Sequence, residues 1–138
     1  MFQLFSQISW LSILAAFLPY FLLGALWFTL FFSKPYMLSL GRENEILAKP
    51  APIFIIGPAL CCLVITIASA ILINALKIDS YENALIFALV AGLGYLVANT
   101  VNIAINPNIP RPLLYGLISG AYHLVGIMIV CVILVAMK

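Results

Sequence analysis

The sequence predicts an all-α integral membrane protein, a bundle of four transmembrane helices that forms a single domain over residues 1–138. Hydrophobic residues make up 66% of the chain and charged residues only 7%. Soluble domains average about 45–50% apolar residues and about 25% charged residues. The six Lys and Arg and four Asp and Glu residues lie in short stretches, and the long apolar segments between these stretches carry no charge. Uncharged apolar runs of about 18 residues or more are typical of membrane spans.

The spans are expected at about residues 8–33, 52–76, 82–105 and 112–137. Each holds about 26 residues, or roughly 39 Å of helix, which crosses about 30 Å of hydrocarbon with some tilt. Trp10 and Trp27 would mark the two interfaces of the first span. Pro19 and Pro58 predict kinks, because proline removes a backbone donor and crowds the preceding turn.

The connections differ in length. Residues 34–50 form the one long loop, in which Lys34-Pro35 ends the first span and Gly41 interrupts an apolar stretch suited to the membrane surface. Residues 77–81 predict a tight turn. Residues 106–112 predict a stiff proline-rich loop, with Pro112 in the first turn of the last helix.

The third span carries a polar stripe. Its members, at spacings of three and four residues on one helical face, are Gly92, Tyr95, Asn99, Asn102 and Asn106. An amide that faces lipid would lack hydrogen-bond partners, so we expect this face to point into the bundle or a wet cavity.

The fourth span has a matching face, formed by Tyr115, Gly116, Ser119, Gly120, His123 and Gly126. If the two spans form a hairpin, counting back from their loop puts Asn99 level with Ser119, and Asn102 level with Gly116. The glycine pair Gly116 and Gly120 would let another backbone approach closely. The polar groups would then meet in the half of the membrane nearer the first and third loops.

Two interpretations of these polar groups stay open. They act as packing glue between helices, or they line a pocket for a small polar or lipid-like ligand. In the pocket, Asn99, Asn102 and Ser119 would donate hydrogen bonds, and His123 would be a switchable donor or acceptor.

Two further residues complete the expected pocket. Trp27 would form an apolar wall. Arg111 would supply a charge at the mouth, or else anchor a phosphate headgroup.

Several absences narrow the function. No carboxylate lies inside a span, which excludes proton exchange of the kind used by four-helix multidrug antiporters. The single histidine and the cysteines Cys61, Cys62 and Cys131 fit no metal site, and we expect neither metal nor cofactor. The net charge of +2 is too small to indicate a nucleic-acid partner.

A non-enzymatic role is therefore favoured, and two alternatives stay open. One is an assembly partner of other membrane proteins. The other is an intramembrane lipid enzyme with His123 as base. A four-helix bundle of this size has few buried positions in which to place a polar stripe. We therefore also expect a homo-oligomer that makes contact through Gly116 and Gly120 or through the asparagine face.

An aromatic pattern closes the first span: Gly24-x-x-Trp27-Phe28, then Phe32-Ser33-Lys34-Pro35-Tyr36. Together with Arg111-Pro112 and Gly120-Ala121-Tyr122-His123, it resembles a bacterial membrane family catalogued as domain of unknown function 1761. Phe28 and Tyr36 stand where that family has tyrosine and tryptophan. The resemblance implies a small multi-span protein of the bacterial inner membrane and no known activity.

The orientation follows from the loop charges. Loops one and three carry Lys34, Arg42, Lys49 and Arg111, whereas the side of the termini carries only Lys77 and Lys138. Because cytoplasmic loops are enriched in Lys and Arg, the termini are expected outside.

Overall fold

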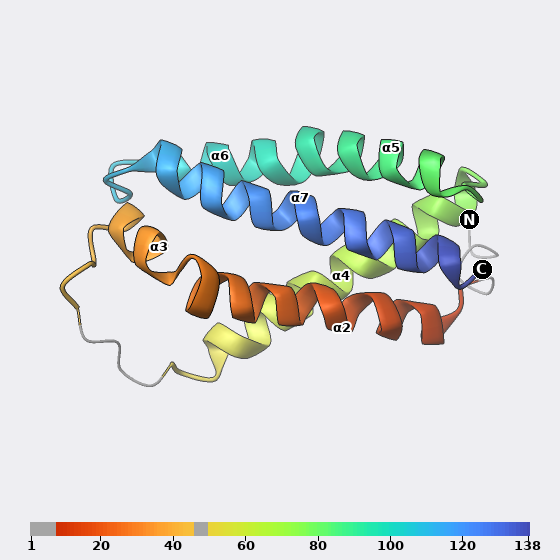
Figure 1. Cartoon of the computed structure of the whole chain (residues 1–138), viewed down its shortest axis with the longest axis horizontal. Coiled ribbons are helices and arrows are strands. Elements are labelled where there is room, and N and C mark those ends of the chain that lie inside the picture. The colour runs from red at the N-terminus through yellow and green to blue at the C-terminus, as the bar shows by residue number, and fades with distance from the viewer. Residues whose placement is uncertain (1–7, 46–49) are drawn as a thin grey trace.

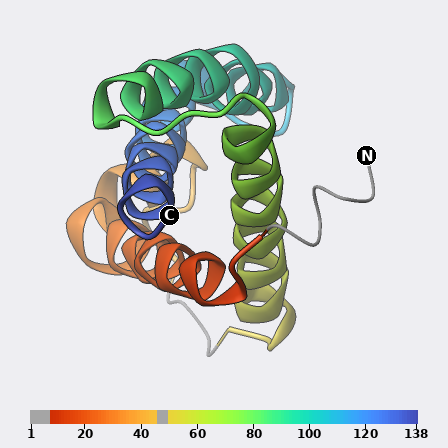
Figure 2. The ribbon, with the colours of Figure 1, turned by 90° about the vertical axis from the view of Figure 1, so that its right-hand side faces the viewer.

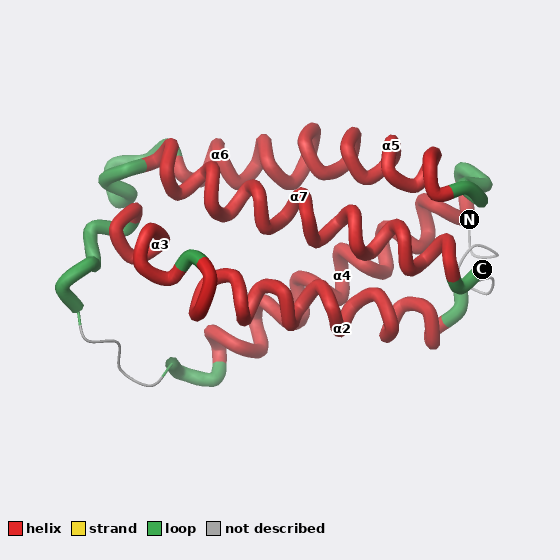
Figure 3. The backbone as a smooth tube through the Cα atoms, viewed as in Figure 1, coloured by secondary structure: helices red, strands yellow, loops and turns green. Residues whose placement is uncertain are grey.

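The structure, a computed structural model, describes residues 8–45 and 50–138, and in this part of the chain it contains helices and loops but no strand (Figure 3). Four helical stretches are long and apolar enough to cross a membrane: Trp10–Phe31, Ile53–Ala75, Tyr81–Ala104 and Pro112–Ala136. The predicted all-α bundle of four transmembrane helices is confirmed. Ile46, Leu47 and Lys49 of the first loop lie outside the described residues.

The first span combines α2 (Trp10–Leu26) with a π-helical turn, η1 (Trp27–Phe31). The side chain of Ser9 caps α2 by accepting a hydrogen bond from the backbone N–H of Ser12 (3.3 Å). The helix continues through Pro19.

The first span ends at Phe32, where φ is −124° and the backbone leaves the helical region. A short helix, α3 (Ser33–Ser39), follows at once. The span therefore ends close to the predicted position, but Lys34 and Pro35 lie within a helix and not in the predicted loop. Pro35 lies in the first turn of α3, where backbone N–H groups have no partner in the helix and a proline costs little.

The end of α3 is held against the start of the last span. Gly41 has φ +68°, a conformation that glycine adopts without steric cost, which confirms that Gly41 interrupts this stretch. The Arg111 guanidinium donates to the carbonyl oxygen of Leu38 (3.1 Å), and the Arg111 backbone N–H donates to that of Ser39 (3.3 Å). A cation at a helix C-terminus also interacts favourably with the helix dipole.

The remaining spans are α4 (Ile53–Ala75), a third composite span, and α7 (Pro112–Ala136). The third span consists of α5 (Tyr81–Ala91), a second π-helical segment η2 (Gly92–Val97), and α6 (Ala98–Ala104). Ser80 caps α5 by accepting from the Asn83 N–H (3.2 Å). Pro112 stands in the first turn of α7, as predicted.

The helix α7 packs against each of the other three spans, α2, α4 and the third span. It lies between α2 and the third span in Figure 1, and Figure 2 shows the four spans arranged around the bundle. In the most apolar stretch of α7, 56% of the residues are buried, compared with 17–22% in the other spans. In Figure 1 the end of α7 lies beside the start of α2, while α3 and the α6–α7 loop lie at the opposite end.

The third span and α7 form the predicted hairpin. A Cβ atom added to Gly116 would lie 3.2 Å from Val101 Cγ2, and one added to Gly120 would lie 3.2 Å from Val97 Cγ1. These contacts confirm that the glycine pair allows close approach, and they confirm the predicted depth to within one residue. The partner of these glycines is in the same chain.

The predicted face of the third span was wrong. Gly92 is buried against α7, but Tyr95, Asn99 and Asn102 are exposed on the outer side. The cause is the π-helical segment η2, because a π turn bonds each N–H to a carbonyl five residues earlier and so takes up more residues than an α turn. Residues beyond η2 are rotated relative to a continuous α-helix. Val101 and Val97 face α7 at Gly116 and Gly120, while Thr100 and Ile103 line a cavity.

Candidate functional site

A cavity of about 610 Å³ lies among α2, η1, α3, α4, α6 and α7. Four of its lining residues come from α7: Tyr115, Ser119, Tyr122 and His123. Their spacing of four, three and one residues places them on one face of the helix. The opposite walls are largely aromatic and aliphatic, and the residues that line the cavity include no Asp, Glu, Lys or Arg.

The Ser119 hydroxyl is the unusual polar group in this wall. Ser119 is 4% exposed, and its Oγ is buried without a hydrogen-bond partner. The other Ser and Thr hydroxyls inside the described spans donate to backbone carbonyls. Thr29, Thr66, Ser69 and Thr100 donate to the carbonyl four residues earlier, and Ser12 donates to that of Ser9. A buried polar group without a partner costs free energy, and this hydroxyl is the buried side-chain polar atom that the described residues leave without a hydrogen bond.

His123 is positioned by a residue that sequence reasoning missed. The Tyr20 hydroxyl lies 3.0 Å from His123 Nδ1. Tyr20 is fully buried, and its ring stacks on Tyr122 with centroids 5.4 Å apart. When the phenol donates to Nδ1, Nε2 carries the imidazole proton and is a donor. Counting depth along each span could have found this pair, because both residues lie near the middle of their helices.

An aromatic series runs along the cavity from α7 to α3. Phe28 packs against Tyr122 (5.3 Å between centroids) and against Tyr36 (4.7 Å), and Tyr36 packs against Tyr115 (5.8 Å). Burial, reinforced by the neighbouring Tyr115, raises the pKa of Tyr36 to about 12. The phenol of Tyr36 therefore stays neutral at physiological pH.

Of the predicted site residues, Ser119 and His123 lie in the cavity wall. Asn99 and Asn102 do not, because their side chains face outward. Their places in the wall are taken by Thr100 and Ile103, each one residue further along the chain. This offset is what the π-helical segment produces.

Trp27 and Arg111 also lie outside the wall. The Trp27 indole N–H donates to the Ile118 carbonyl (3.0 Å) and packs behind Tyr122, with ring centroids 6.4 Å apart. The Arg111 guanidinium is engaged with the end of α3. Neither residue is among those that line this cavity, because each side chain is directed to a backbone carbonyl elsewhere.

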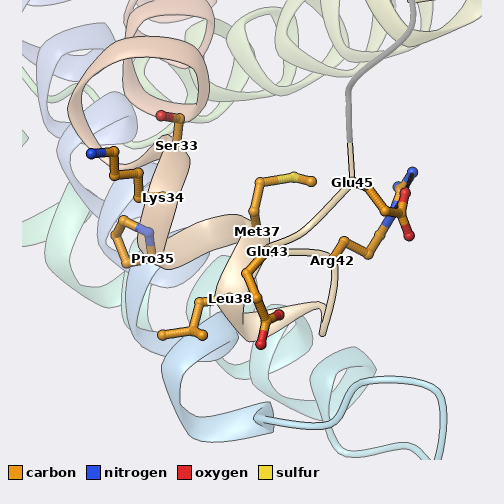
Figure 4. Close-up of a pocket in the computed structure, with 8 residues that line it drawn as sticks. All are labelled: Ser33, Lys34, Pro35, Met37, Leu38, Arg42, Glu43 and Glu45. Atoms are coloured by element: carbon orange, nitrogen blue, oxygen red, sulfur yellow. Dashed lines mark hydrogen bonds and ion pairs between the residues drawn. The ribbon is translucent and has the colours of Figure 1, made fainter.

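A second hollow, of about 590 Å³, lies beside α3 on the loop side (Figure 4). Arg42 and Glu45 form an exposed ion pair there, with Nη2 and Oε2 2.6 Å apart. This hydrogen bond raises the pKa of Arg42 and lowers that of Glu45. The charges of this pair satisfy each other at an open surface, so we do not regard the hollow as a binding site.

The described ranges 8–45 and 50–138 hold no group of three or more His, Cys, Asp or Glu residues that could bind a metal ion. Cys61, Cys62 and Cys131 are free thiols. Cys62 and Cys131 are buried, as predicted for small apolar side chains, whereas Cys61 is exposed on the outside of α4.

A family model described as protein of unknown function (DUF1761) matches residues 11–135, nearly the whole chain. The chain belongs to the DUF1761 family. The predicted resemblance is thereby confirmed. No curated protein and no solved structure matches this DUF1761 protein.

Proposed function

We propose that this DUF1761 protein is a non-enzymatic membrane protein that binds a small, largely apolar ligand with a neutral polar group in the cavity beside α7. The buried hydroxyl of Ser119 in the cavity wall carries the proposal. Ligand sites in proteins are concave, mostly apolar, and contain a few placed polar groups. Ser119 and the Nε2 atom of His123 would supply those groups.

Blocking the cavity tests the proposal. Ala25 lines the cavity but is itself exposed, so Ala25→Phe adds a ring at the mouth with little disturbance of the core. We expect native mass spectrometry of protein released from mild detergent to show a bound small molecule on the wild type and at least a fivefold loss of it in Ala25→Phe.

Leu22→Phe is the matched control, because Leu22 lies on the same helix at 56% exposure and does not line the cavity. This variant should retain the bound mass. Equal occupancy in the Ala25→Phe and Leu22→Phe proteins would rule out this cavity as the site.

We also propose that copies of the chain associate through the outer face of the third span. Asn99 and Asn102 are both exposed on this face. Gly94 and Ala98 lie beside them, exposed and one helical turn apart, a small-residue pair that favours helix contact. Gly116 and Gly120 are occupied within the chain, so the asparagine face is the better of the two predicted contacts.

This proposal predicts that Asn99→Leu combined with Asn102→Leu converts an oligomer to a monomer in native mass spectra recorded from mild detergent. Leu113→Ile, an exposed change at the start of α7, should leave the oligomer intact. Co-purification of the wild type with a larger complex, and not with itself, would instead support the assembly-partner alternative. A monomeric wild type without any partner would refute both.

An enzymatic role has less support. In the described part of the chain, His123 Nδ1 lies against the Tyr20 hydroxyl. The residues that line the cavity include no carboxylate that could help activate a nucleophile. For location, we propose the bacterial inner membrane with the termini outside. The support is that Lys34, Arg42 and Arg111 lie at the α3 end of the bundle, against Lys77 and Lys138 at the other.

A further inference from the structure

We infer that the cavity takes a neutral, flat ring that bears two carbonyl oxygens and carries an apolar tail, the chemistry of a membrane quinone. This inference rests on the proposed function and names its ligand class. The first support is charge. No ionised side chain lines the cavity, and a charged group moved into such surroundings without a partner would pay a large desolvation cost. A phosphate or carboxylate headgroup is thus disfavoured inside.

The second support is the shape of the walls. Six aromatic rings line the cavity, those of Phe21, Phe28, Tyr36, Phe54, Tyr115 and Tyr122. Some of them already pack on one another at centroid distances of 4.7–5.8 Å, within the range of favourable ring pairs. A planar ligand ring can extend this series. The branched aliphatic side chains that would best suit an acyl chain are two, Ile55 and Ile103, beside the smaller Ala25, Pro50 and Pro58.

The third support is the spacing of the free donors. Ser119 and His123 lie four residues apart on the cavity face of α7, which separates them by about 6 Å along the axis at 1.5 Å per residue. The two oxygens of a ring dione stand at opposite ends of the ring, a comparable separation. Ser119 Oγ has no partner, and Tyr20 occupies only the Nδ1 side of His123. Each carbonyl can therefore accept one hydrogen bond.

The fourth support is a route for the tail. Phe54 and Ile55 on α4 and Ile103 on α6 line the cavity and are also exposed on the outside, by 71%, 53% and 56%. The helix α4 packs mainly against α2 and α7. A ring can thus occupy the cavity while its tail passes between α4 and α6 into the bilayer.

Tryptophan fluorescence tests the inference, because the chain has two tryptophans and Trp27 packs behind the cavity residue Tyr122. In the Trp10→Phe protein, Trp27 is the sole reporter. We expect decylubiquinone to quench its fluorescence saturably in dodecylmaltoside micelles. Adding Ala25→Phe should leave only the linear quenching that micelle partitioning causes.

A hydroxyl comparison sharpens the test. Ser119→Ala in the Trp10→Phe background should raise the apparent Kd for decylubiquinone about fivefold, the equivalent of one hydrogen bond. Ser69→Ala, which removes a hydroxyl satisfied within its own helix and outside the cavity, should leave the Kd unchanged. Equal effects of the two changes would overturn the role given to Ser119.

A second probe separates the two proposals. Bromine on the acyl chain of a phosphatidylcholine quenches nearby tryptophan. If this lipid quenches Trp27 saturably and decylubiquinone does not, the quinone inference fails and the ligand-binding cavity stands. If neither probe gives saturable quenching and wild-type protein carries no bound mass, both the inference and the proposed function fail.

Discussion

Gly126→Ala is expected to destabilise the bundle by about 1–3 kcal/mol, the usual cost of overpacking a tight core. Gly126 faces α2, and a Cβ atom at this position would overlap the ring of Tyr20 at Cδ2 and Cε2. Tyr20 is fully buried and cannot move outward freely. Its ring must shift, which also weakens its hydrogen bond to His123. Unfolding by SDS in mixed micelles measures the change.

Two other glycines provide graded controls. Gly94 has no neighbouring atom within 4 Å of an added Cβ, and Gly94→Ala should change stability by less than about 0.5 kcal/mol, as surface substitutions do. In Gly116→Ala the new Cβ atom would lie 3.2 Å from Val101 Cγ2, so the loss of stability should be intermediate between those of Gly94→Ala and Gly126→Ala. A loss in Gly94→Ala as large as that in Gly126→Ala would contradict the overlap as the cause.

Tyr20→Ala is expected to cost about 3–5 kcal/mol, the range for removing a buried aromatic side chain. The substitution removes the stack on Tyr122 and leaves His123 Nδ1 without its partner. Tyr20→Phe keeps the ring and removes only the hydroxyl, so its cost should be about 1–3 kcal/mol, that of an unsatisfied buried group. The same SDS titration separates the two contributions.

Combining the substitutions adds a sharper check. In the Tyr20→Ala background the space beside Gly126 is empty, so Gly126→Ala should cost little or become stabilising there. Such non-additivity is typical of residues in direct contact. Strictly additive costs would mean that Tyr20 and Gly126 do not share one packing site.

Much of the fold was predictable because hydropathy and charge act over whole helices. The four spans follow from long uncharged runs, and the depth of Gly116 against Val101 follows from counting back from a short loop. The short helix α3 was missed because Lys34-Pro35 resembles a stop. Proline is also acceptable in a first turn, and the break at Phe32 leaves no strong mark in the sequence.

The site was less predictable, for two physical reasons. Helical spacing assumes a uniform period, and the π-helical segment Gly92–Val97 rotates Asn99 and Asn102 out of the cavity and Thr100 and Ile103 into it. Contacts between distant segments leave no local pattern either. The bond from Trp27 to Ile118 joins residues 91 positions apart, and that from Tyr20 to His123 joins residues 103 apart.

The heavy burial of α7 has a consequence for how this small protein can vary. A soluble domain shares its buried positions among several elements, but here one helix supplies the largest share of them, with 56% of its most apolar stretch buried against 17–22% in the other spans. Most substitutions on the outer helices exchange one lipid-facing side chain for another. Tolerance to mutation should therefore depend mainly on which helix a residue belongs to, and less on how deep in the membrane it lies. The other spans can drift in sequence, while α7, which holds both the packing and the cavity donors, has little room to change.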